Sequence, residues 1–445
     1  MPFRLHPSRL WWLLLAAALP GCTTVPESGR TLDRPSDLPW QGFGVEWDPT
    51  WWQTASRDSG YDSTGWRLTL ARLDSLGPTP VRMMLHLKWF TQDPTLKTWN
   101  WNGPNARSVL AHLDALKARD IPVLVCEWGW AARPKAGEQL FSRADDTLQA
   151  VGIARLLREL VVDRGYSNIR WYSVGNEPES EMRATAGDIA WTRLTESVYE
   201  RLEAAKVPLA RLATEEGVRH GLSDATSRRM LRGATVAGYH SYLEAGTLES
   251  ALDGQHLPDG LPLWFTEAGM AGGSTFTHPD IDNPKIGVEI LSIGLAAMRR
   301  GASAVFAWTL HDGVYDFMPR SPMRWGMWAG PRAGWKLRPW ARAWTLLTKA
   351  VPVGSRLRIP AGIPSGIRAL EIERPDGSMG LLVANQSWDT LVVPLEPVYR
   401  GAWSERRYDG RSDQGGGLLL PESDVALSDR LVLPPYTALA LRRKP

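Results

Sequence analysis

The chain has 445 residues, which is more than one average domain and fits a barrel of about 250 to 300 residues plus a smaller module. Its hydrophobic share of 43% and charged share of 22% are ordinary for a soluble globular protein. The formal net charge is only +3 and no run of Lys and Arg stands out, so the sequence has no electrostatic feature that points to nucleic-acid binding. Trp is unusually frequent, at 23 residues, and indole serves both in cores and as a flat stacking surface for ligands.

The first 22 residues have the features of a secretory signal. A basic start precedes an apolar run over 11–19 that is too short to span a bilayer. The Leu-Pro-Gly-Cys sequence that ends at Cys22 resembles the lipoprotein box of bacteria, in which the cysteine is lipidated, although Pro20 departs from the usual residue there. The resemblance implies an extracytoplasmic, lipid-anchored protein, on the outer membrane if the host is Gram-negative, because no Asp follows Cys22. Ordinary cleavage and secretion is the alternative.

Residues 23–39 are polar with scattered proline and predict a tether. Beyond them, short apolar runs alternate eight times with longer amphipathic stretches. The short runs, which we predict to be strands, are 43–47, 81–87, 121–127, 169–174, 211–214, 236–239, 263–266 and 304–308. The longer stretches place apolar residues at three- and four-residue spacing, as helices do, and include 64–76, 106–119, 146–163, 188–205 and 284–300.

This alternation predicts an α/β fold built from parallel strand–helix–strand units. Eight units favour a closed (β/α)8 TIM barrel over residues 40–351, and no Gly-rich phosphate loop follows the first strand, as a dinucleotide-binding sheet would require. From 352 to 445 the chain is rich in Gly, Pro and turn residues, and helical periodicity ends. There we predict a small C-terminal β-sandwich domain, with either a structural or a sugar-binding role.

Carboxylates gather where the predicted strands end, which is where barrel enzymes place their chemistry. These positions are occupied by Glu46, Glu127, Glu177, Glu215 or Glu216, and Glu267. Taken singly, each can be a hydrogen-bonded structural group or a substrate contact. Local context selects two of them: the fourth strand ends in Asn176-Glu177-Pro178, and the seventh ends at Glu267.

An Asn-Glu-Pro sequence at the end of strand four, with a second Glu at the end of strand seven, resembles the clan A glycoside hydrolases, which are retaining (β/α)8-barrel glycosidases. The resemblance covers the whole barrel. It implies that Glu177 is the acid/base, that Asn176 holds the 2-hydroxyl of the sugar, and that Glu267 is the nucleophile. The implied activity is hydrolysis of a β-linked oligo- or polysaccharide.

Other strand ends extend this resemblance. Arg82 on the second strand is similar to the arginine that hydrogen-bonds the nucleophile, and His240 and Tyr242 after the sixth strand resemble the His-x-Tyr pair beside the same carboxylate. Trp308 ends strand eight, where clan members commonly place an aromatic floor under the reacting sugar. Structural alternatives remain, because Arg82 can pair with any barrel carboxylate and His240 can be a buried, satisfied histidine.

The first and third strands depart from the commonest members of the clan. Glu46 and Trp47 end the first strand, and Glu127 and Trp128 end the third. We expect these four residues to line the sugar site, with Glu46 or Glu127 holding hydroxyl groups. The departures leave the identity of the sugar open and do not affect the type of reaction.

The chemistry implied by the resemblance sets requirements on both carboxyl groups. A pair about 5 Å apart supplies the proton and the nucleophile of a double displacement with retention. Glu177 must then hold a proton in the free enzyme, so its pKa should be raised. Donors such as Arg82 and Tyr242 should hold the pKa of Glu267 down.

Two other functions compete with this hypothesis. A sugar-binding surface lipoprotein on an inactive barrel would have no need of Glu at both catalytic positions. A barrel enzyme of metal or phosphate chemistry is less favoured, because the eight histidines show no metal-ligand spacing and no Gly-rich cradle follows strands seven and eight. We therefore expect no metal and no cofactor, a carbohydrate as the partner, and a monomeric chain.

Overall fold

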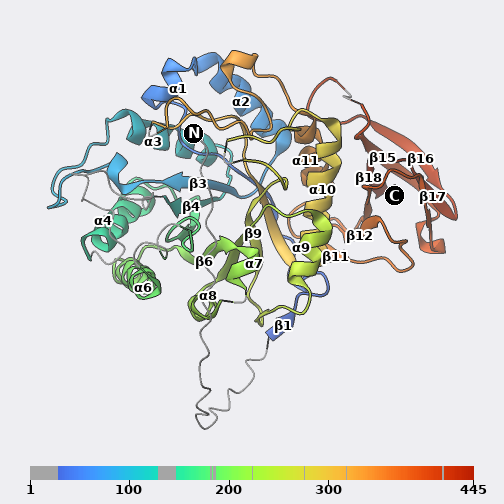
Figure 1. Cartoon of the computed structure of the whole chain (residues 1–445), viewed down its shortest axis with the longest axis horizontal. Coiled ribbons are helices and arrows are strands. Elements are labelled where there is room, and N and C mark those ends of the chain that lie inside the picture. The colour runs from blue at the N-terminus through green and yellow to red at the C-terminus, as the bar shows by residue number, and fades with distance from the viewer. Residues whose placement is uncertain are drawn as a thin grey trace, which may run out of the picture.

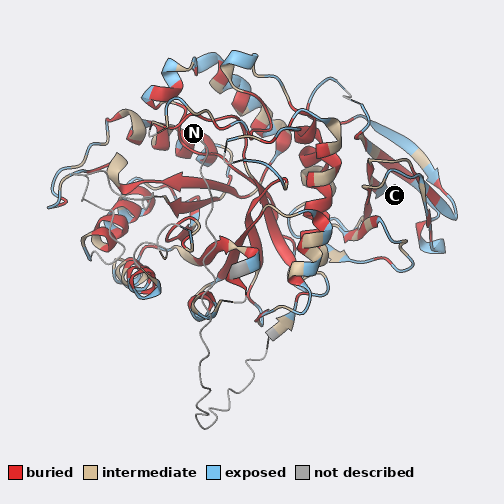
Figure 2. Ribbon diagram, in the orientation of Figure 1, coloured by how far each residue is buried: buried red, intermediate tan, exposed pale blue. Residues whose placement is uncertain are grey.

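Eight parallel strands close into a barrel, as the alternating apolar runs predict. The computed structural model describes residues 29–128, 147–180, 183, 187–222, 224–274, 276–316, 318–412 and 415–444. The strands are β2 (Gly42–Glu46), β3 (Val81–Leu85), β4 (Val123–Glu127), β5 (Ile169–Ser173), β6 (Ala210–Gly217), β7 (Val236–Ser241), β9 (Leu263–Ala268) and β10 (Ala302–Ala307). Their order around the barrel is β10-β2-β3-β4-β5-β6-β7-β9. Helices cover the outside of the barrel, so its strands are buried on both faces (Figures 1 and 2).

The surrounding helices agree with the amphipathic stretches. The longer ones are α2 (Ser63–Leu76), α3 (Pro104–Lys117), α4 (Thr147–Arg158), α6 (Asp188–Ala204), α8 (Ala225–Leu231), α9 (Ala245–Leu252), α10 (Pro284–Arg299) and α11 (Pro339–Ala350). Short helices are α1 (Thr54–Asp58), α7 (Val218–Gly221), a π turn at Glu159–Asp163 that prolongs α4, and single turns at Leu87–Trp89, Pro331–Ala333 and Pro397–Tyr399.

The sequence explains the ends of these helices. The Asp62 carboxylate accepts a hydrogen bond from the Gly65 N–H at the start of α2, and Gly77 ends that helix with a φ of 61°, a conformation that glycine adopts at little cost. At the start of α10 the Asn283 side chain accepts from the Lys285 N–H. Within the described residues no helix is both long enough and apolar enough to cross a bilayer.

The predicted tether contains a short stretch, residues 29–32, that packs against the folded chain. Residues 1–28, which include the predicted signal and Cys22, lie outside the described residues. The segment that follows is docked on the barrel: β1 (Gly29–Thr31) pairs antiparallel with β8 (His256–Pro258). Leu32 is fully buried, and the Arg30 guanidinium donates to the backbone carbonyls of Leu261 and Gly301, each at 3.2 Å. A polar composition therefore did not prevent this stretch from packing.

The C-terminal domain is a small antiparallel sandwich of two unequal sheets. The larger sheet has the order β11-β12-β13-β18-β15-β16, and the smaller is the pair β14-β17. Their bounds are β11 (Arg356–Arg358), β12 (Ile367–Glu373), β13 (Met379–Asn385), β14 (Leu391–Pro394), β15 (Gly401–Asp409), β16 (Glu422–Leu427), β17 (Arg430–Leu433) and β18 (Thr437–Arg443).

Alternation along the strands gives the larger sheet two apolar faces. Ile367 and Leu381 pack with Leu433 of the smaller sheet, whereas Leu370 and Leu382 belong to the core that the domain shares with the barrel. The shared face lies against α10 and α11, beside which the domain stands in Figure 1. The domain therefore packs on the outer helices of the barrel through this face.

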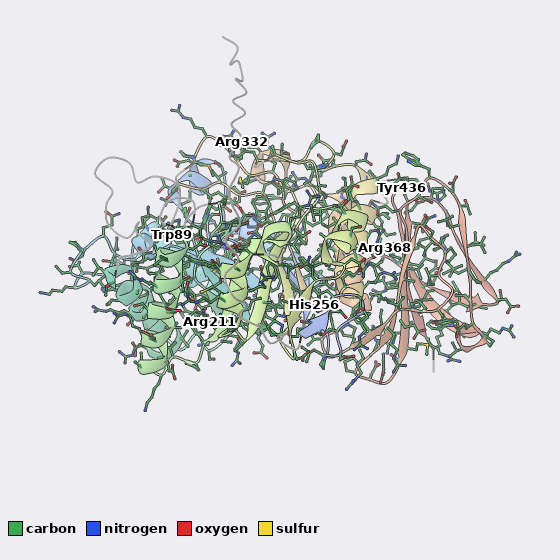
Figure 3. All side chains as sticks on the ribbon, turned by 60° about the horizontal axis from the view of Figure 1, so that its bottom comes forward. Trp89, Arg211, His256, Arg332, Arg368 and Tyr436 are labelled. Carbon is green, nitrogen blue, oxygen red and sulfur yellow. The ribbon has the colours of Figure 1, made fainter. Side chains whose placement is uncertain are left out.

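The carboxyl ends of the barrel strands all lie at one pole of the molecule. In Figure 3, Trp89 after β3 and Arg332 in the long segment after β10 lie toward the upper side. Arg211 near the start of β6 and His256 before β9 lie toward the lower side. The upper pole is where side chains at strand ends converge.

Candidate active site

Arg82 is the centre of a buried charge cluster inside the barrel mouth. It lies on β3 and is fully buried. Its guanidinium contacts Glu46, donates to Glu215 from Nε at 3.0 Å, and donates to Glu267 Oε1 at 2.7 Å. A further N–H donates to Asn176 Oδ1 at 2.8 Å. A single rigid fork of donors thus fixes residues of three other strands and of the loop after β5 relative to one another.

Glu267 ends β9 and is held on both carboxylate oxygens. Arg82 donates to Oε1, and the Tyr242 hydroxyl donates to Oε2 at 2.6 Å. The Glu267 side chain is 6% exposed. These two donors orient the carboxylate toward the pocket and stabilise its ionised form.

Glu177 reaches the same place from the loop after β5. Gly175 turns the chain with a φ of 99°, which only glycine adopts easily, and Glu177 itself has a φ of 40°, an uncommon conformation for a residue with a side chain. The Glu177 N–H donates to the Glu215 carbonyl at 3.1 Å, which holds this turn. The Glu177 side chain is 37% exposed and so meets solvent far more than Glu267 does.

His240 connects these carboxylates. Its Nδ1 lies 3.2 Å from Glu177 Oε1 and 3.6 Å from Glu267 Oε2, while its Nε2 lies 3.3 Å from Glu215 Oε2. One ring nitrogen of His240, one oxygen of Glu177 and one of Glu267 all lie within 4.8 Å of one another. The structure therefore brings the two residues selected from the sequence face to face.

The same three side chains are the one set in the described part of the chain with atoms close enough to hold a metal ion. Both oxygens of Glu267 already accept hydrogen bonds, however, and the guanidinium 2.7 Å from one of them repels a cation. The arrangement suits proton transfer and nucleophilic attack better than ion binding.

The two carboxyl groups behind Glu267 differ in protonation. Burial raises the pKa of Glu46 well above its ordinary value in spite of the Arg82 contact, so the neutral acid is favoured. Burial also opposes ionisation of Glu215, but the charges and hydrogen bonds of Arg82 and His240 lower its pKa to about 2. Glu215 is therefore the anion that balances Arg82.

The pKa shifts of the two selected residues are opposite to the expectation from sequence. Burial alone would raise the pKa of Glu177, but the hydrogen bond and charge of His240 lower it below its ordinary value. Burial raises the pKa of Glu267, and the charge of Glu177 adds to this effect. The pKa of His240 is raised well above its ordinary value, against the effect of burial, by Glu267, Glu177 and Glu215. The expectation did not account for an imidazole surrounded by three carboxylates.

A pocket of about 350 Å³ opens above the cluster. It is lined by Met84, Trp128, Asn176, Glu177, Tyr242, Glu267, Met270, Gly272, Gly273, Ser274, Trp308, Tyr315, Met323 and Trp325. Trp308 packs on Trp325 at 5.6 Å between ring centroids and meets Tyr242 edge-on at 6.1 Å. Carboxylates and aromatic faces in one cavity form a site that suits a sugar ring.

Six residues predicted from the sequence meet at this pocket or directly behind it, in addition to the two carboxylates. Asn176, Tyr242, Trp128 and Trp308 line the pocket, whereas Arg82 and His240 lie behind Glu177 and Glu267 and orient them. Arg82 and His240 were expected beside the carboxylate at the end of the seventh strand, and the structure places them 2.7 Å and 3.6 Å from Glu267.

Three predicted sugar contacts are wrong. Glu46 is fully buried beneath Arg82 and does not line the pocket. Trp47 is 1% exposed, donates from its indole N–H to His311 at 3.0 Å and packs on Trp66, because successive side chains of a strand point to opposite faces. Glu127 is also fully buried, accepts from the Leu87 N–H at 3.1 Å, and has a pKa that burial raises to about 8.

Other residues of the site were not selected from the sequence. Glu215 was one of several strand-end carboxylates, and nothing local set it apart from Glu216, which instead pairs with Arg183 at 2.5 Å. Tyr315 and Trp325 enter the pocket from the long segment after β10. A Trp–Gly–Met–Trp sequence marks that segment, but sequence alone does not show which indole faces the pocket.

The architecture matches several solved structures at low sequence identity, glycoside hydrolases among them. The catalytic domain of GH30 xylanase C from Talaromyces cellulolyticus aligns with a TM-score of 0.66 at 13% identity, over 93% of this chain and 99% of that chain. A GH39 beta-xylosidase from Caulobacter crescentus aligns with a TM-score of 0.61 at 16% identity, over 93% and 97%. SrfJ from Salmonella typhimurium aligns with a TM-score of 0.65 at 14% identity, over 97% and 95%. No protein-family model and no curated protein matches the chain. At these identities the similarity establishes a shared fold, and function must be argued from the site.

Proposed function

We propose that the chain is a retaining glycoside hydrolase, with Glu177 as acid/base and Glu267 as nucleophile. The observation that carries this proposal is the approach of the two carboxylates to within 4.8 Å in one pocket. Double displacement uses a separation of about 5 Å, whereas inversion requires about 6.5 to 9.5 Å to admit a water molecule. Their surroundings divide the roles, because Glu267 is clamped by two donors and Glu177 is open to solvent.

The reaction then has two steps. A Glu267 oxygen bonds to the anomeric carbon as the glycosidic C–O bond breaks, and Glu177 gives its proton to the departing oxygen. The resulting ester on Glu267 carries no charge. In the second step Glu177 takes a proton from water, whose oxygen attacks the anomeric carbon and releases Glu267 as a carboxylate. Two inversions give net retention.

The hydrogen bond between His240 and Glu177 explains how the acid acquires its proton. A charged imidazole beside a carboxylate and a neutral imidazole beside a carboxylic acid contain the same proton, which crosses a contact of 3.2 Å. A sugar that covers Glu177 removes water from its carboxylate, which favours the neutral acid. The transfer removes both the Glu177 charge that raises the pKa of Glu267 and the His240 charge that lowers it, so Arg82 and Tyr242 are the donors that keep the nucleophile ionised.

The substrate we propose is a β-linked oligo- or polysaccharide. The aromatic walls of the pocket, from Trp128, Trp308, Tyr315 and Trp325, support a sugar, since its C–H faces stack on such rings. Structures that share the fold are described as xylanases and xylosidases, which makes β-xylosides the first compounds to assay. We also propose that a lipid on Cys22 anchors the enzyme outside the cytoplasm, on the basis of the Leu-Pro-Gly-Cys sequence.

The proposal is tested by comparing Glu267→Ala and Glu177→Ala on aryl β-glycosides. Glu267→Ala should lose turnover and recover part of it with azide, which attacks the vacated face and gives a glycosyl azide of the opposite anomer. Glu177→Ala should keep activity on substrates with good leaving groups, which need no proton. Equal losses on all substrates in both variants, without an azide effect, contradict the assigned roles. An inactive wild-type chain that still binds sugars would show a binding protein instead.

A further inference from the structure

A second cavity lies behind one wall of the active-site pocket, on the same pole of the barrel. It measures about 840 Å³ and contains Arg332, which lies toward the upper side of Figure 3. The segment 322–325 separates the two cavities. Its side chains alternate, so that Pro322 and Arg324 line the second cavity while Met323 and Trp325 line the active-site pocket. We call the second cavity the basic cavity, for the reason that follows.

Positive charge is concentrated in this cavity. Its lining includes five cationic side chains, which are Arg320, Arg324, Arg332, Lys336 and Arg338, and two carboxylates, which are Asp282 and Asp312. The surplus of three positive charges equals the formal net charge of the whole chain, +3. The lining of this cavity therefore carries a formal surplus of positive charge next to the active-site pocket.

Internal ion pairs use only part of that charge. Arg338 forms a bidentate pair with Asp312, at 2.6 and 3.0 Å, and this pair is nearly buried. Asp282 lies 3.5 Å from Arg338 and 4.0 Å from Lys336. The two carboxylates of the cavity are thus both committed to these neighbours.

The remaining three guanidinium groups are uncompensated. Arg320, Arg324 and Arg332 are exposed, and none of them has an ion pair with a carboxylate in the part of the chain that the structure describes. Three unpaired arginines around one concave site repel one another unless an anion is shared between them. Guanidinium groups bind carboxylate and sulfate through two parallel hydrogen bonds, so an oxyanion is the ligand that these three side chains suit.

We propose that the basic cavity binds anionic substituents, carboxylate or sulfate, of the polysaccharide whose neutral part enters the active-site pocket. This inference rests on the proposed function, since the shared wall places the anion next to a sugar-binding pocket. Arg324 is joined to Thr277 by a β-bridge, and Trp325 donates to the Ser274 carbonyl at 3.1 Å, so the wall is tied to the segment after β9. The enzyme would therefore prefer an acidic polymer to a neutral one.

The test is affinity electrophoresis of the full chain carrying Glu177→Gln, which binds without turnover. The gels contain carboxymethylcellulose or hydroxyethylcellulose, and likewise cellulose sulfate or methylcellulose. All four share a β-linked glucan backbone, and only the first of each pair is anionic. The variant removes the three unpaired charges through Arg320→Gln, Arg324→Gln and Arg332→Gln. A matched control loses three exposed charges elsewhere through Arg193→Gln, Arg356→Gln and Arg430→Gln. Vesicles of anionic phospholipid test a membrane surface as the alternative ligand.

We expect at least one anionic polymer to retard the parent chain and neither neutral polymer to do so. The cavity variant should bind that anionic polymer about tenfold or more weakly than the parent, and the control should bind it as the parent does. Which polymer binds identifies carboxylate or sulfate as the ligand. The proposal would be overturned by any of three results: the cavity variant and the control are retarded equally, neither anionic polymer retards the parent chain, or the chain binds only to vesicles. A separate assay measures hydrolysis of small neutral aryl glycosides by chains that keep Glu177 and carry the same arginine substitutions. If no chain hydrolyses them, the proposed function is refuted, whereas the proposed anion site is not.

Discussion

Nδ1 of His240 lies 3.2 Å from Oε1 of Glu177, and Nε2 of the same ring lies 3.3 Å from Glu215. The imidazole therefore has a carboxylate on each nitrogen, and both of them stabilise its protonated form. In the mechanism proposed above, the proton that Glu177 delivers is therefore held by His240 in the free protein. This relationship makes the pH dependence of the reaction a property of the pair.

The first prediction concerns His240→Gln. In the wild type, loss of activity at high pH reports loss of the single proton of the His240–Glu177 pair, and that pKa is raised well above the ordinary histidine value. In the variant Glu177 must keep the proton alone, and its carboxyl group has a lower ordinary pKa. The basic limb of kcat/KM should therefore move to lower pH. A substrate with a dinitrophenol leaving group, which needs no proton, should show no such movement, and a shift of equal size on that substrate would contradict the relay.

A second prediction contrasts Glu215→Gln with Glu46→Gln, two changes of equal size on the same guanidinium. The pKa of Glu215 is lowered to about 2 by Arg82 and His240 against the effect of burial, so its stabilisation is present above its unfolded pKa and is lost as the pH falls from about 5 toward about 2. Glu215→Gln should cost about 3 kcal/mol of unfolding free energy at pH 7, and the deficit should shrink in acid. Urea denaturation at a series of pH values measures it.

Glu46 behaves oppositely, because burial raises its pKa well above the ordinary value. A group of this kind stabilises below its unfolded pKa, and that contribution is lost as the pH rises. Glu46→Gln replaces a neutral acid by a neutral amide, so it should be at least as stable as the wild type at pH 8. A loss as large as that of Glu215→Gln would show that Glu46 is ionised.

A third prediction separates the roles of two tryptophans. Trp308→Ala should lower kcat/KM by one to three orders of magnitude, about 1.4 to 4 kcal/mol, because the indole lines the pocket and stacks best on the flattened ring of the transition state. Its unfolding free energy should change little. Trp47→Ala should instead cost about 3 to 5 kcal/mol of stability, because this indole is fully packed. Wild-type kinetics in Trp308→Ala would move the stacking role to Trp128.

The fourth prediction is that Cys22→Ser changes localisation. The Leu-Pro-Gly-Cys sequence predicts lipid on Cys22, and a serine cannot carry the thioether. The variant should shift from the membrane fraction to the soluble extracytoplasmic fraction and lose the mass of the acyl chains. Unchanged fractionation and unchanged mass would remove the anchor.

The barrel could be predicted because its signal is local. Strands buried on both faces appear as short apolar runs, and helices between them appear as amphipathic periodicity. The catalytic candidates were also accessible, since an Asn-Glu-Pro sequence at the fourth strand end and a Glu at the seventh fix both their identity and their position. Leu32 shows where prediction from local sequence fails, because its segment packs by pairing with β8, which is far away in the sequence.

The inner part of the site could not be predicted in the same way. Adjacent residues of a strand face opposite sides, so Glu46 and Trp47 could not both have lined the pocket, and the side that each faces depends on the register of the barrel. Glu215 points inward through an irregularity between β6 and β7 and a φ of 64°, which no local sequence signal announces. The pKa of Glu177 is lowered and that of Glu267 is raised, the reverse of the expectation, because of their distances from His240 and from each other, and only the fold sets those distances.

The central claim, that Glu267 forms a covalent bond to the sugar, is tested most directly by trapping. The aryl β-glycoside that is hydrolysed best is converted to its 2-deoxy-2-fluoro analogue with a dinitrophenol leaving group, which slows release of the ester more than its formation. Peptide mass spectrometry then locates the added sugar. The account predicts a label on Glu267 that is absent from Glu267→Gln. A label on another residue, or no label together with a product of inverted anomeric configuration, would contradict it.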